Sequence, residues 1–377
     1  MVNFAKFAGV KIFVMKKTIL STLALAAFCI CVSAQTPKDP EYVYTEASEL
    51  NLIGKILDTP NPYHRVDTCV FKGFTEGENK QVRCSAGLAV LFKTNSTSIS
   101  VTAEFGYKYY GLNTMPIALR GFDLYIKKDG KWLWAADKVR PAGNEDGEIV
   151  IIKDMDDSMK ECMLYLPMYS ELYSVKIGVE KGKVLEALES PFRHRVAIFG
   201  SSYTQGVSVS RSGMTYPMQF MRNTGIQLLG LGCSGNSKLQ PYFADVLIAA
   251  DADAILLDAF SNPDAKMIEE RLFPFIDRIR AAKPDIPLIF MQTITCERRN
   301  FNRHYEEYDR SKQEMAAKMM AEAVKKYNDV YFIKTNATAP SHDTSVDGTH
   351  PSDYGYTLWA KSIEKPVLKI LRKYGLK

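Results

Sequence analysis

Residues 195–206 read RVAIFGSSYTQG, an apolar segment typical of a strand that ends in a loop of small and polar residues. Four later segments have the same apolar character, at residues 226–231, 254–260, 287–293 and 330–335. Helical patterns lie between most of them; apolar side chains recur at helical spacing from Ile268 to Ile279, for example. Alternating strands and helices predict a parallel sheet covered on both faces, with functional groups beyond the carboxyl ends of its strands.

The preceding part of the chain, from residue 42 to about 188, has the pattern of an all-β region. Short strands are predicted at residues 88–92, 98–102, 123–126, 132–134, 148–153 and 173–179. Asp129-Gly130 stands between two of them and is a strong signal for a hairpin turn. Several short strands with regular turns predict a β-sandwich.

The N-terminus has the order of a secretory signal. Lys16 and Lys17 precede an apolar run, residues 19–32, which ends in the small residues Ser33 and Ala34. We therefore expect a signal peptide over residues 1–34 with its true start at Met15, and an uncleaved anchor is the alternative. The remaining domains are expected at residues 35–188 and 189–377, in a periplasmic or secreted protein without stable membrane insertion.

Removal of residues 1–34 lowers the formal net charge from +5 to +1. A nearly neutral protein gives no electrostatic reason to expect nucleic acid or an anionic membrane surface as a partner. The five remaining cysteines match no zinc-binding spacing, so no metal is expected. Cys69 and Cys84 could form a disulfide across a hairpin or remain reduced, and the sequence does not decide between these states.

Four loops of the α/β region carry groups suited to acyl transfer, at residues 200–206, 232–236, 258–263 and 347–351. A serine hydroxyl needs an imidazole to take its proton, and the imidazole needs an orienting carboxylate. Asp347 and His350 stand three apart around Gly348, so one tight turn can supply both groups. Either Ser201 or Ser202 could be the nucleophile, and His342 beside Asp343 could compete as the base. Each motif taken alone is common in ordinary turns and helix caps.

An oxyanion forms during acyl transfer and needs hydrogen-bond donors that are already in place. Backbone N–H groups beside Ser202 and at Gly235, with the side-chain amide of Asn262, could supply three such donors. Outside these loops, Arg211 could bind a substrate carboxylate or carbonyl, or simply be solvated. Trp132 and Trp134 could form a platform for a sugar ring or belong to the sandwich core.

These residues resemble the four sequence blocks of the SGNH/GDSL hydrolases, in order and with plausible spacing. The residues that carry this resemblance are Gly200, Ser202, Gly206, Gly235, Asn262 and the Asp347-x-x-His350 pair. Residues 121–125 also match the Gly-x-Asp-Leu-Tyr signature found in the N-terminal β domain of a two-domain GDSL-like lipase/acylhydrolase subgroup. The match departs at the Gly-Asp-Ser-Leu core, where this chain has Ser201 and Tyr203 in place of the acidic residue and the leucine. Asn262 likewise stands in Phe-Ser-Asn-Pro (residues 260–263) rather than in Gly-x-Asn-Asp.

The resemblance implies a three-layer, flavodoxin-like SGNH hydrolase domain after a jelly-roll-like sandwich. It implies Ser202 as the nucleophile, His350 as the base and Asp347 as its orienting group, with an oxyanion hole formed by Ser202, Gly235 and Asn262. No cofactor is required. The expected activity is removal of O-acetyl or other short acyl groups, from a carbohydrate or another acylated molecule. The alternatives are a lipid esterase, a thioesterase or an acyltransferase with the same triad, and a non-catalytic glycan-binding protein.

Overall fold

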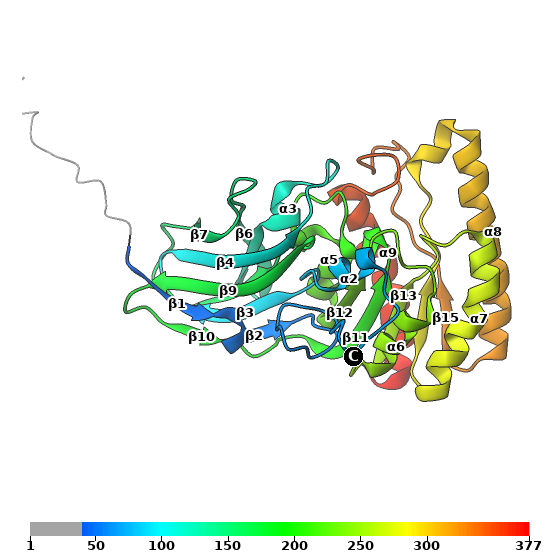
Figure 1. The fold of residues 1–377 in the computed structure, drawn as a ribbon, viewed down its shortest axis with the longest axis horizontal. Helices are drawn as coiled ribbons and strands as arrows, with labels where there is room; N and C mark the ends of the chain where they lie inside the picture. Colours follow the sequence, from blue (N-terminus) through cyan, green and yellow to red (C-terminus); the bar gives the residue numbers. More distant parts are fainter. Residues whose placement is uncertain (1–39, 377) are drawn as a thin grey trace, which may run out of the picture. The chain divides into compact units, whose positions relative to one another are not determined.

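A five-stranded parallel sheet forms the C-terminal part of the chain (Figure 1). The computed structural model describes residues 40–376, so the predicted signal segment lies outside the described residues. In spatial order the strands are β12 (Ile226–Gly232), β11 (Arg193–Gly200), β13 (Ala254–Asp258), β14 (Leu288–Met291) and β15 (Val330–Ile333). This order is the flavodoxin-like one, so the predicted fold class of this region is confirmed. The order reverses at β11, and ligands bind beyond the strand ends at such a reversal.

Helices cover both faces of this sheet (Figure 1). They are α4 (Ser202–Gln205), α5 (Tyr216–Thr224), α6 (Pro241–Ala249), α7 (Ala265–Ala282), α8 (Arg303–Lys326) and α9 (Asp353–Leu371), with the short 3-10 turns η2 (Ser212–Met214), η3 (Glu297–Phe301) and η4 (Arg372–Tyr374). Val196 and Ile198 of β11 pack into the core shared with α5 and α9, whereas Ala197 and Phe199 pack into the core shared with α6, α7 and α8. Because successive side chains of a strand point to opposite faces, one apolar strand supplies both cores.

Two antiparallel sheets form the N-terminal β region and enclose a core between them. The first contains β1 (Tyr42–Glu46), β9 (Ser170–Glu180), β4 (Ile99–Lys108) and β7 (Gly147–Ile152). The second contains β10 (Leu185–Ala187), β3 (Ala89–Thr94), β8 (Lys160–Tyr165), β5 (Phe122–Lys128) and β6 (Lys131–Lys138), with β2 (Asn51–Ile53) beside β3. The shorter elements are η1 (Ala47–Glu49), α2 (Glu76–Val82) and α3 (Pro116–Arg120). The predicted all-β sandwich is therefore confirmed.

The central strands of the second sheet, β3, β8 and the first half of β5, are buried on both faces. Val90 of β3 faces the core between the sheets, whereas its neighbour Leu91 packs with Met163 against Met218 and Met221 of α5. The two parts also meet through backbone, because the N–H of Gly230 donates to the carbonyl of Gly54 at 3.0 Å. The chain from Tyr42 onward accordingly forms one compact unit.

The Gly-x-Asp-Leu-Tyr signature explains part of this attachment. Asp123 of β5 is fully buried, and its carboxylate accepts hydrogen bonds from the Gly213 N–H at 2.8 Å and from Arg211 Nη1 at 3.1 Å. The guanidinium of Arg211 also lies over the rings of Tyr125 and Trp134. The signature thus binds the β region to η2, the segment that leads into α5.

A second buried charge fixes the end of β12. The Arg65 side chain is completely buried and donates from Nε to the Cys84 carbonyl and from Nη1 to the Gly232 carbonyl, both at 2.8 Å. Burial lowers the pKa of this guanidinium, and backbone carbonyl dipoles satisfy its N–H groups. Arg65 therefore links the β region to the loop that follows β12.

A third buried charge holds the ends of β11 and β13 together. The Asp258 carboxylate accepts hydrogen bonds from the hydroxyls of Ser201 at 2.9 Å, Thr204 at 3.1 Å and Ser261 at 2.5 Å. Burial raises the pKa of Asp258 to about 6, although these hydroxyl groups oppose the shift. One carboxylate therefore holds the loop after β11 against the loop after β13.

Cys69 and Cys84 are both free thiols, the first exposed and the second buried. Among residues 40–376, no helix combines the length and apolar character needed to cross a bilayer.

Replacing Asp123 by alanine should lower the free energy of unfolding by about 3 kcal/mol, because Arg211 and the Gly213 N–H would lose a buried partner. The measurement is chemical denaturation of the purified protein. Asp245→Ala is the matched control, since Asp245 pairs with Arg278 on the surface. It should leave stability nearly unchanged. Equal losses in the two variants would contradict a structural role for the signature.

The stability of the protein should also depend on the protonation of Asp258. Its pKa of about 6 in the folded protein lies above the ordinary aspartate value of about 3.9 in an unfolded chain. The folded state therefore binds more protons between these values, and the contribution of Asp258 to stability rises as the pH falls through 6. Between pH 7.5 and pH 5, the wild type should gain about 1 kcal/mol relative to Asp258→Asn. Denaturation curves whose difference does not change with pH would contradict this assignment.

Candidate active site

Ser202 is the first residue of α4, directly beyond the carboxyl end of β11. The Ser201 side chain caps this short helix by accepting a hydrogen bond from the Tyr203 N–H, and Gly206 ends it with a left-handed φ of 108°. Gly200 is required just before the turn, because a Cβ there would lie 2.0 Å from Thr204 Oγ1. The sharp turn from strand to helix places the Ser202 hydroxyl at the edge of the sheet.

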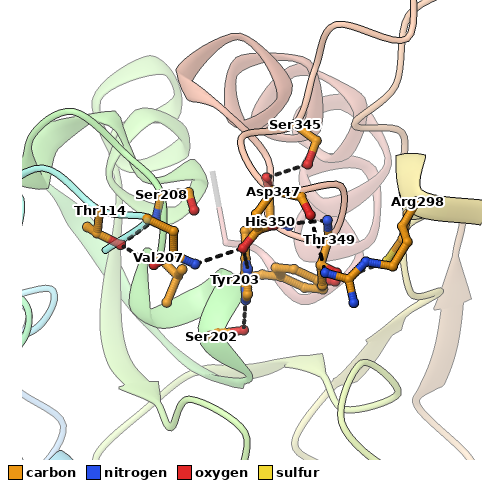
Figure 2. Close-up of polar contacts among 12 residues, drawn as sticks. Thr114, Ser202, Tyr203, Val207, Ser208, Arg298, Ser345, Asp347, Thr349 and His350 are labelled. Atoms are coloured by element: carbon orange, nitrogen blue, oxygen red, sulfur yellow. Dashed lines mark hydrogen bonds and ion pairs between the residues drawn. The ribbon is translucent and has the colours of Figure 1, made fainter. Parts of the chain in front are cut away.

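Ser202, His350 and Asp347 form a continuous hydrogen-bonded array (Figure 2). Ser202 Oγ lies 3.0 Å from His350 Nε2, and His350 Nδ1 lies 2.8 Å from Asp347 Oδ2. Burial alone would raise the pKa of Asp347, but hydrogen bonds from the backbone and ring of His350 and from Asn113 hold it well below its usual range. The carboxylate therefore stays ionised and can stabilise a protonated imidazole.

The loop that carries Asp347 and His350 is itself firmly held (Figure 2). Asp347 Oδ1 accepts from the His350 N–H at 2.7 Å, and Ser345 Oγ donates to the His350 carbonyl at 2.8 Å. Gly348 has the left-handed φ of 82° that the tight turn needs. The backbone N–H of Arg298 donates to the Gly348 carbonyl at 2.7 Å. These contacts orient the imidazole before any substrate arrives.

Asn113 was not identified from the sequence. Its Nδ2 donates to Asp347 Oδ2 at 2.7 Å, although the two residues are 234 positions apart. Asn113 belongs to the segment between β4 and α3, so the β region contributes directly to the array. The adjacent Thr114 accepts a hydrogen bond from the Ser208 N–H at 2.9 Å and fixes this segment near the site (Figure 2). No local sequence pattern marks Asn113, because its role depends entirely on the packing of the β region.

Gly235 and Asn262 line the same cavity as Ser202. Asn262 Oδ1 accepts a hydrogen bond from the Ser237 N–H at 3.2 Å, which leaves the amide nitrogen for another acceptor. The N–H of Ser234, next to Gly235, donates to Gln205 Oε1 at 2.9 Å and holds the loop close to α4. The three residues predicted to supply oxyanion donors, Ser202, Gly235 and Asn262, therefore line one cavity.

The alternatives for nucleophile and base have other partners. Ser201 Oγ donates to the buried carboxylate of Asp258, so this hydroxyl faces away from the imidazole. His342 lies against Glu297, with Nδ1 at 2.8 Å from Oε2, and its side chain is exposed. Geometry therefore favours Ser202 and His350 over their neighbours in sequence.

The departures from the Gly-Asp-Ser-Leu core have structural counterparts. Where the motif has an acidic residue, the Ser201 hydroxyl instead meets the carboxylate of Asp258 from β13. Tyr203 replaces the leucine, and its ring packs edge-on against His350 and Trp359 at centroid distances of 5.6 and 5.5 Å. Ser201 and Tyr203, which stand where the motif has other residues, thus both make contacts that support the site.

Arg211, for which substrate binding or simple solvation was expected, has contacts of a different kind. Arg211 does not line the cavity around Ser202; its guanidinium is engaged by Asp123 and Tyr125, as described above. Trp134 covers this guanidinium, and the half-buried Trp132 packs beside the core at α5. Arg211 thus has the contacts of a structural residue, because its positive charge is paired with the buried carboxylate of Asp123.

The cavity at Ser202 has a volume of about 390 Å³. Beyond Ser202, His350 and the oxyanion donors, its walls are formed by Tyr203, Ser234, Ser261, Cys296, Arg298, Tyr305, Tyr308, Asp309, Lys312 and Thr349. Lys312 and Asp309 are largely buried and lie 3.6 Å apart, so one wall carries an ion pair. Within the described part of the chain, no group of three or more histidine, cysteine or acidic side chains could hold a metal ion.

Comparison with known proteins places this geometry in a family. Residues 193–369 match the GDSL-like lipase/acylhydrolase family, and residues 41–185 match the N-terminus of esterases of the SGNH-hydrolase type. A comparison with curated protein sequences finds no match.

Solved structures agree over most of the chain. A protein described as a GDSL-like lipase from Bacteroides ovatus ATCC 8483 is 37% identical, with a TM-score of 0.85, over 88% of this chain and 98% of that one. A salicylyl-acyltransferase from a tetracycline biosynthetic pathway (20% identity, TM-score 0.65) and a family two carbohydrate esterase from Cellvibrio japonicus (10%, 0.60) have the same coverage of 88% and 98% and share the fold. The chain belongs to the GDSL-like lipase/acylhydrolase family of SGNH-type esterases, in the form that carries a Gly-x-Asp-Leu-Tyr region before the hydrolase region.

Proposed function

We propose that this protein is an exported serine esterase that removes O-acetyl or another short acyl group from a carbohydrate. The observation that carries the proposal is the hydrogen-bonded array of Ser202, His350 and Asp347, which opens into the cavity that Gly235 and Asn262 also line. Nucleophile, base, orienting carboxylate and oxyanion donors are the complete set that acyl transfer through a covalent intermediate needs.

The proposed reaction has two halves. Ser202 Oγ attacks the ester carbonyl carbon while His350 Nε2 takes the hydroxyl proton, and the oxyanion accepts hydrogen bonds from the Ser202 and Gly235 N–H groups and from Asn262. The C–O bond to the alcohol then breaks, and the alcohol leaves with the proton from His350. In the second half, His350 takes a proton from water, the hydroxide attacks the acyl-enzyme, and the acid is released as Ser202 regains its proton.

The cavity wall favours a short acyl group. Arg298, Asp309 and Lys312 are charged residues in the lining of this cavity. A long alkyl chain would have to lie against these groups and displace water from them without replacing its hydrogen bonds. The charged lining of the cavity therefore disfavours the lipid-esterase alternative.

Two kinds of observation support a carbohydrate as the alcohol part of the substrate ester. The fold is shared with a family two carbohydrate esterase from Cellvibrio japonicus, and the β region next to the triad presents tyrosine and amide side chains. The shared fold of a salicylyl-acyltransferase keeps acyl transfer to a second alcohol as the competing reaction. The intact triad disfavours a purely glycan-binding role. Export to the periplasm or medium is proposed from the signal-like pattern of residues 1–34.

The wild type should hydrolyse p-nitrophenyl acetate faster than the butyrate and much faster than the octanoate, because the charged wall rejects longer chains. Ser202→Ala should lower turnover by about 10⁴-fold or more, since the nucleophile is lost. Release of p-nitrophenol measures both effects. Ser201→Ala is the matched comparison and should lose far less activity than Ser202→Ala, because Ser201 caps α4 and binds Asp258 but makes no contact with His350.

The opposite results would be informative. Preference for octanoate would overturn the short-acyl proposal, and activity that survives in Ser202→Ala but not in Ser201→Ala would overturn the choice of nucleophile. Hydrolysis that gives way to ester formation when a sugar alcohol is added would favour an acyltransferase.

Asn113→Ala should lower kcat about tenfold with little change in KM, because Asp347 would lose a hydrogen bond that orients it and keeps it ionised. Asn113→Asp should lower kcat further than Asn113→Ala at neutral pH, since two carboxylates would face each other. Its activity relative to wild type should recover as the pH falls and the introduced carboxyl takes up a proton.

The control for this pair is Asn223→Ala, which removes an asparagine that donates to the exposed carboxylate of Glu364 at 2.6 Å. The pH–rate profile separates positioning from folding, because a merely destabilised variant would not regain relative activity in acid. An Asn113→Asp profile parallel to that of the wild type would contradict the proposed role.

A further inference from the structure

A second depression, of about 210 Å³, adjoins the cavity at Ser202. Its walls are Gln81, Tyr107, Tyr109, Asn113, Tyr169, Val207, Ser234 and His350. Ser234 and His350 line both hollows, so the two meet at the catalytic imidazole. Most of the remaining lining comes from the β region.

This depression lies on the side of His350 where the leaving alcohol of the ester would be expected. In the proposed reaction, His350 delivers a proton to the alcohol oxygen, which must therefore lie next to the imidazole. The oxyanion donors Gly235 and Asn262 line only the first cavity, which also contains the nucleophile. The depression beyond His350 is thus placed to hold the alcohol part of an ester whose carbonyl lies at Ser202.

The lining has the mixed chemistry that a sugar ring requires. Tyr109 is 43% exposed, and its ring lies 5.6 Å from that of Tyr169 between centroids, which provides an aromatic surface for the apolar face of a sugar. The side chains of Gln81 and Asn113 add amide groups to the same walls. Aromatic side chains with a few fixed polar groups are the usual lining of small-molecule sites.

Tyr169 gives this depression a buried hydroxyl that has no well-placed hydrogen-bond partner in the protein. The residue is only 4% exposed, yet its hydroxyl makes no hydrogen bond within normal geometry, although the Ser234 side chain lies nearby. A buried hydroxyl without a partner is costly, and a ligand hydroxyl in the depression would satisfy it.

The walls are fixed before a ligand binds. Gln81 Nε2 donates to the Ser234 carbonyl at 2.9 Å, and the Tyr109 N–H donates to the Tyr169 carbonyl at 3.2 Å. Asn113 is held by Asp347. A site that is already ordered loses less entropy when its ligand binds.

We infer that Tyr107, Tyr109 and Tyr169, with Gln81, form a binding subsite for the carbohydrate alcohol of the substrate. This inference rests on the proposed function and adds to it that the β region, rather than the hydrolase region, recognises the sugar. The Ser202 cavity would then hold the acyl group.

The test compares two acetyl esters that differ only in the alcohol. Acetylated xylo-oligosaccharides can reach the tyrosines, whereas ethyl acetate has a leaving group too small to do so; acetate release measures both. Tyr109→Ala should lower kcat/KM for the oligosaccharide about tenfold, mainly through KM, and Tyr169→Phe about fivefold. Both variants should hydrolyse ethyl acetate within twofold of the wild type. Tyr173→Ala, an exposed β9 tyrosine outside the depression, should match the wild type on both esters.

The outcomes separate the inference from the function on which it rests. If the wild type cleaves neither ester, the proposed esterase function fails. If it cleaves ethyl acetate but no acetylated xylo- or gluco-oligosaccharide, the carbohydrate assignment and the subsite fail together. If it cleaves both but the tyrosine variants lose the two activities equally, or lose neither, the subsite alone is overturned.

Discussion

The packing of the six-stranded sheet against α5 is the constraint on which the candidate site depends. Leu91 and Met163 on one face of that sheet bury the side chains of Met218 and Met221, while the other face closes the sandwich core. Because both faces are covered, the β region cannot move relative to the hydrolase region without exposing apolar surface. This fixed placement allows Asn113 to reach the triad.

Three aspartates, of which Asp123 and Asp258 are buried and Asp347 is half-buried, are stabilised in different ways. Asp123 pairs with the cation of Arg211, Asp258 is surrounded by hydroxyl donors without a cation, and Asp347 receives hydrogen bonds from His350 and Asn113. The outcome differs accordingly: the pKa of Asp258 is raised to about 6, whereas that of Asp347 lies well below its usual range. Only Asp347 must remain charged for the proposed chemistry, and it is the one whose hydrogen bonds outweigh the effect of burial.

Much of the fold could be predicted because its elements have clear local patterns. The five parallel strands are short apolar runs between helical repeats, and the hairpin at Asp129-Gly130 joins β5 and β6 as expected. The strand β8 (Lys160–Tyr165) was missed, because it is buried on both faces and lacks the alternation that marks a half-buried strand. The structural role of Arg211 was also missed, since its partner Asp123 is distant in sequence.

Local sequence patterns are enough to predict the parallel sheet and to single out Ser202, Asp347 and His350, because strand periodicity and short motifs are properties of neighbouring residues. The tertiary structure adds the difference between Ser201 and Ser202, since the buried carboxylate of Asp258 engages the first hydroxyl and the second lies beside His350. It alone also brought Asn113 to Asp347 and the tyrosines of the β region to His350. Contacts between residues so far apart along the chain are set by how two layers pack, and no local pattern in the chain encodes them.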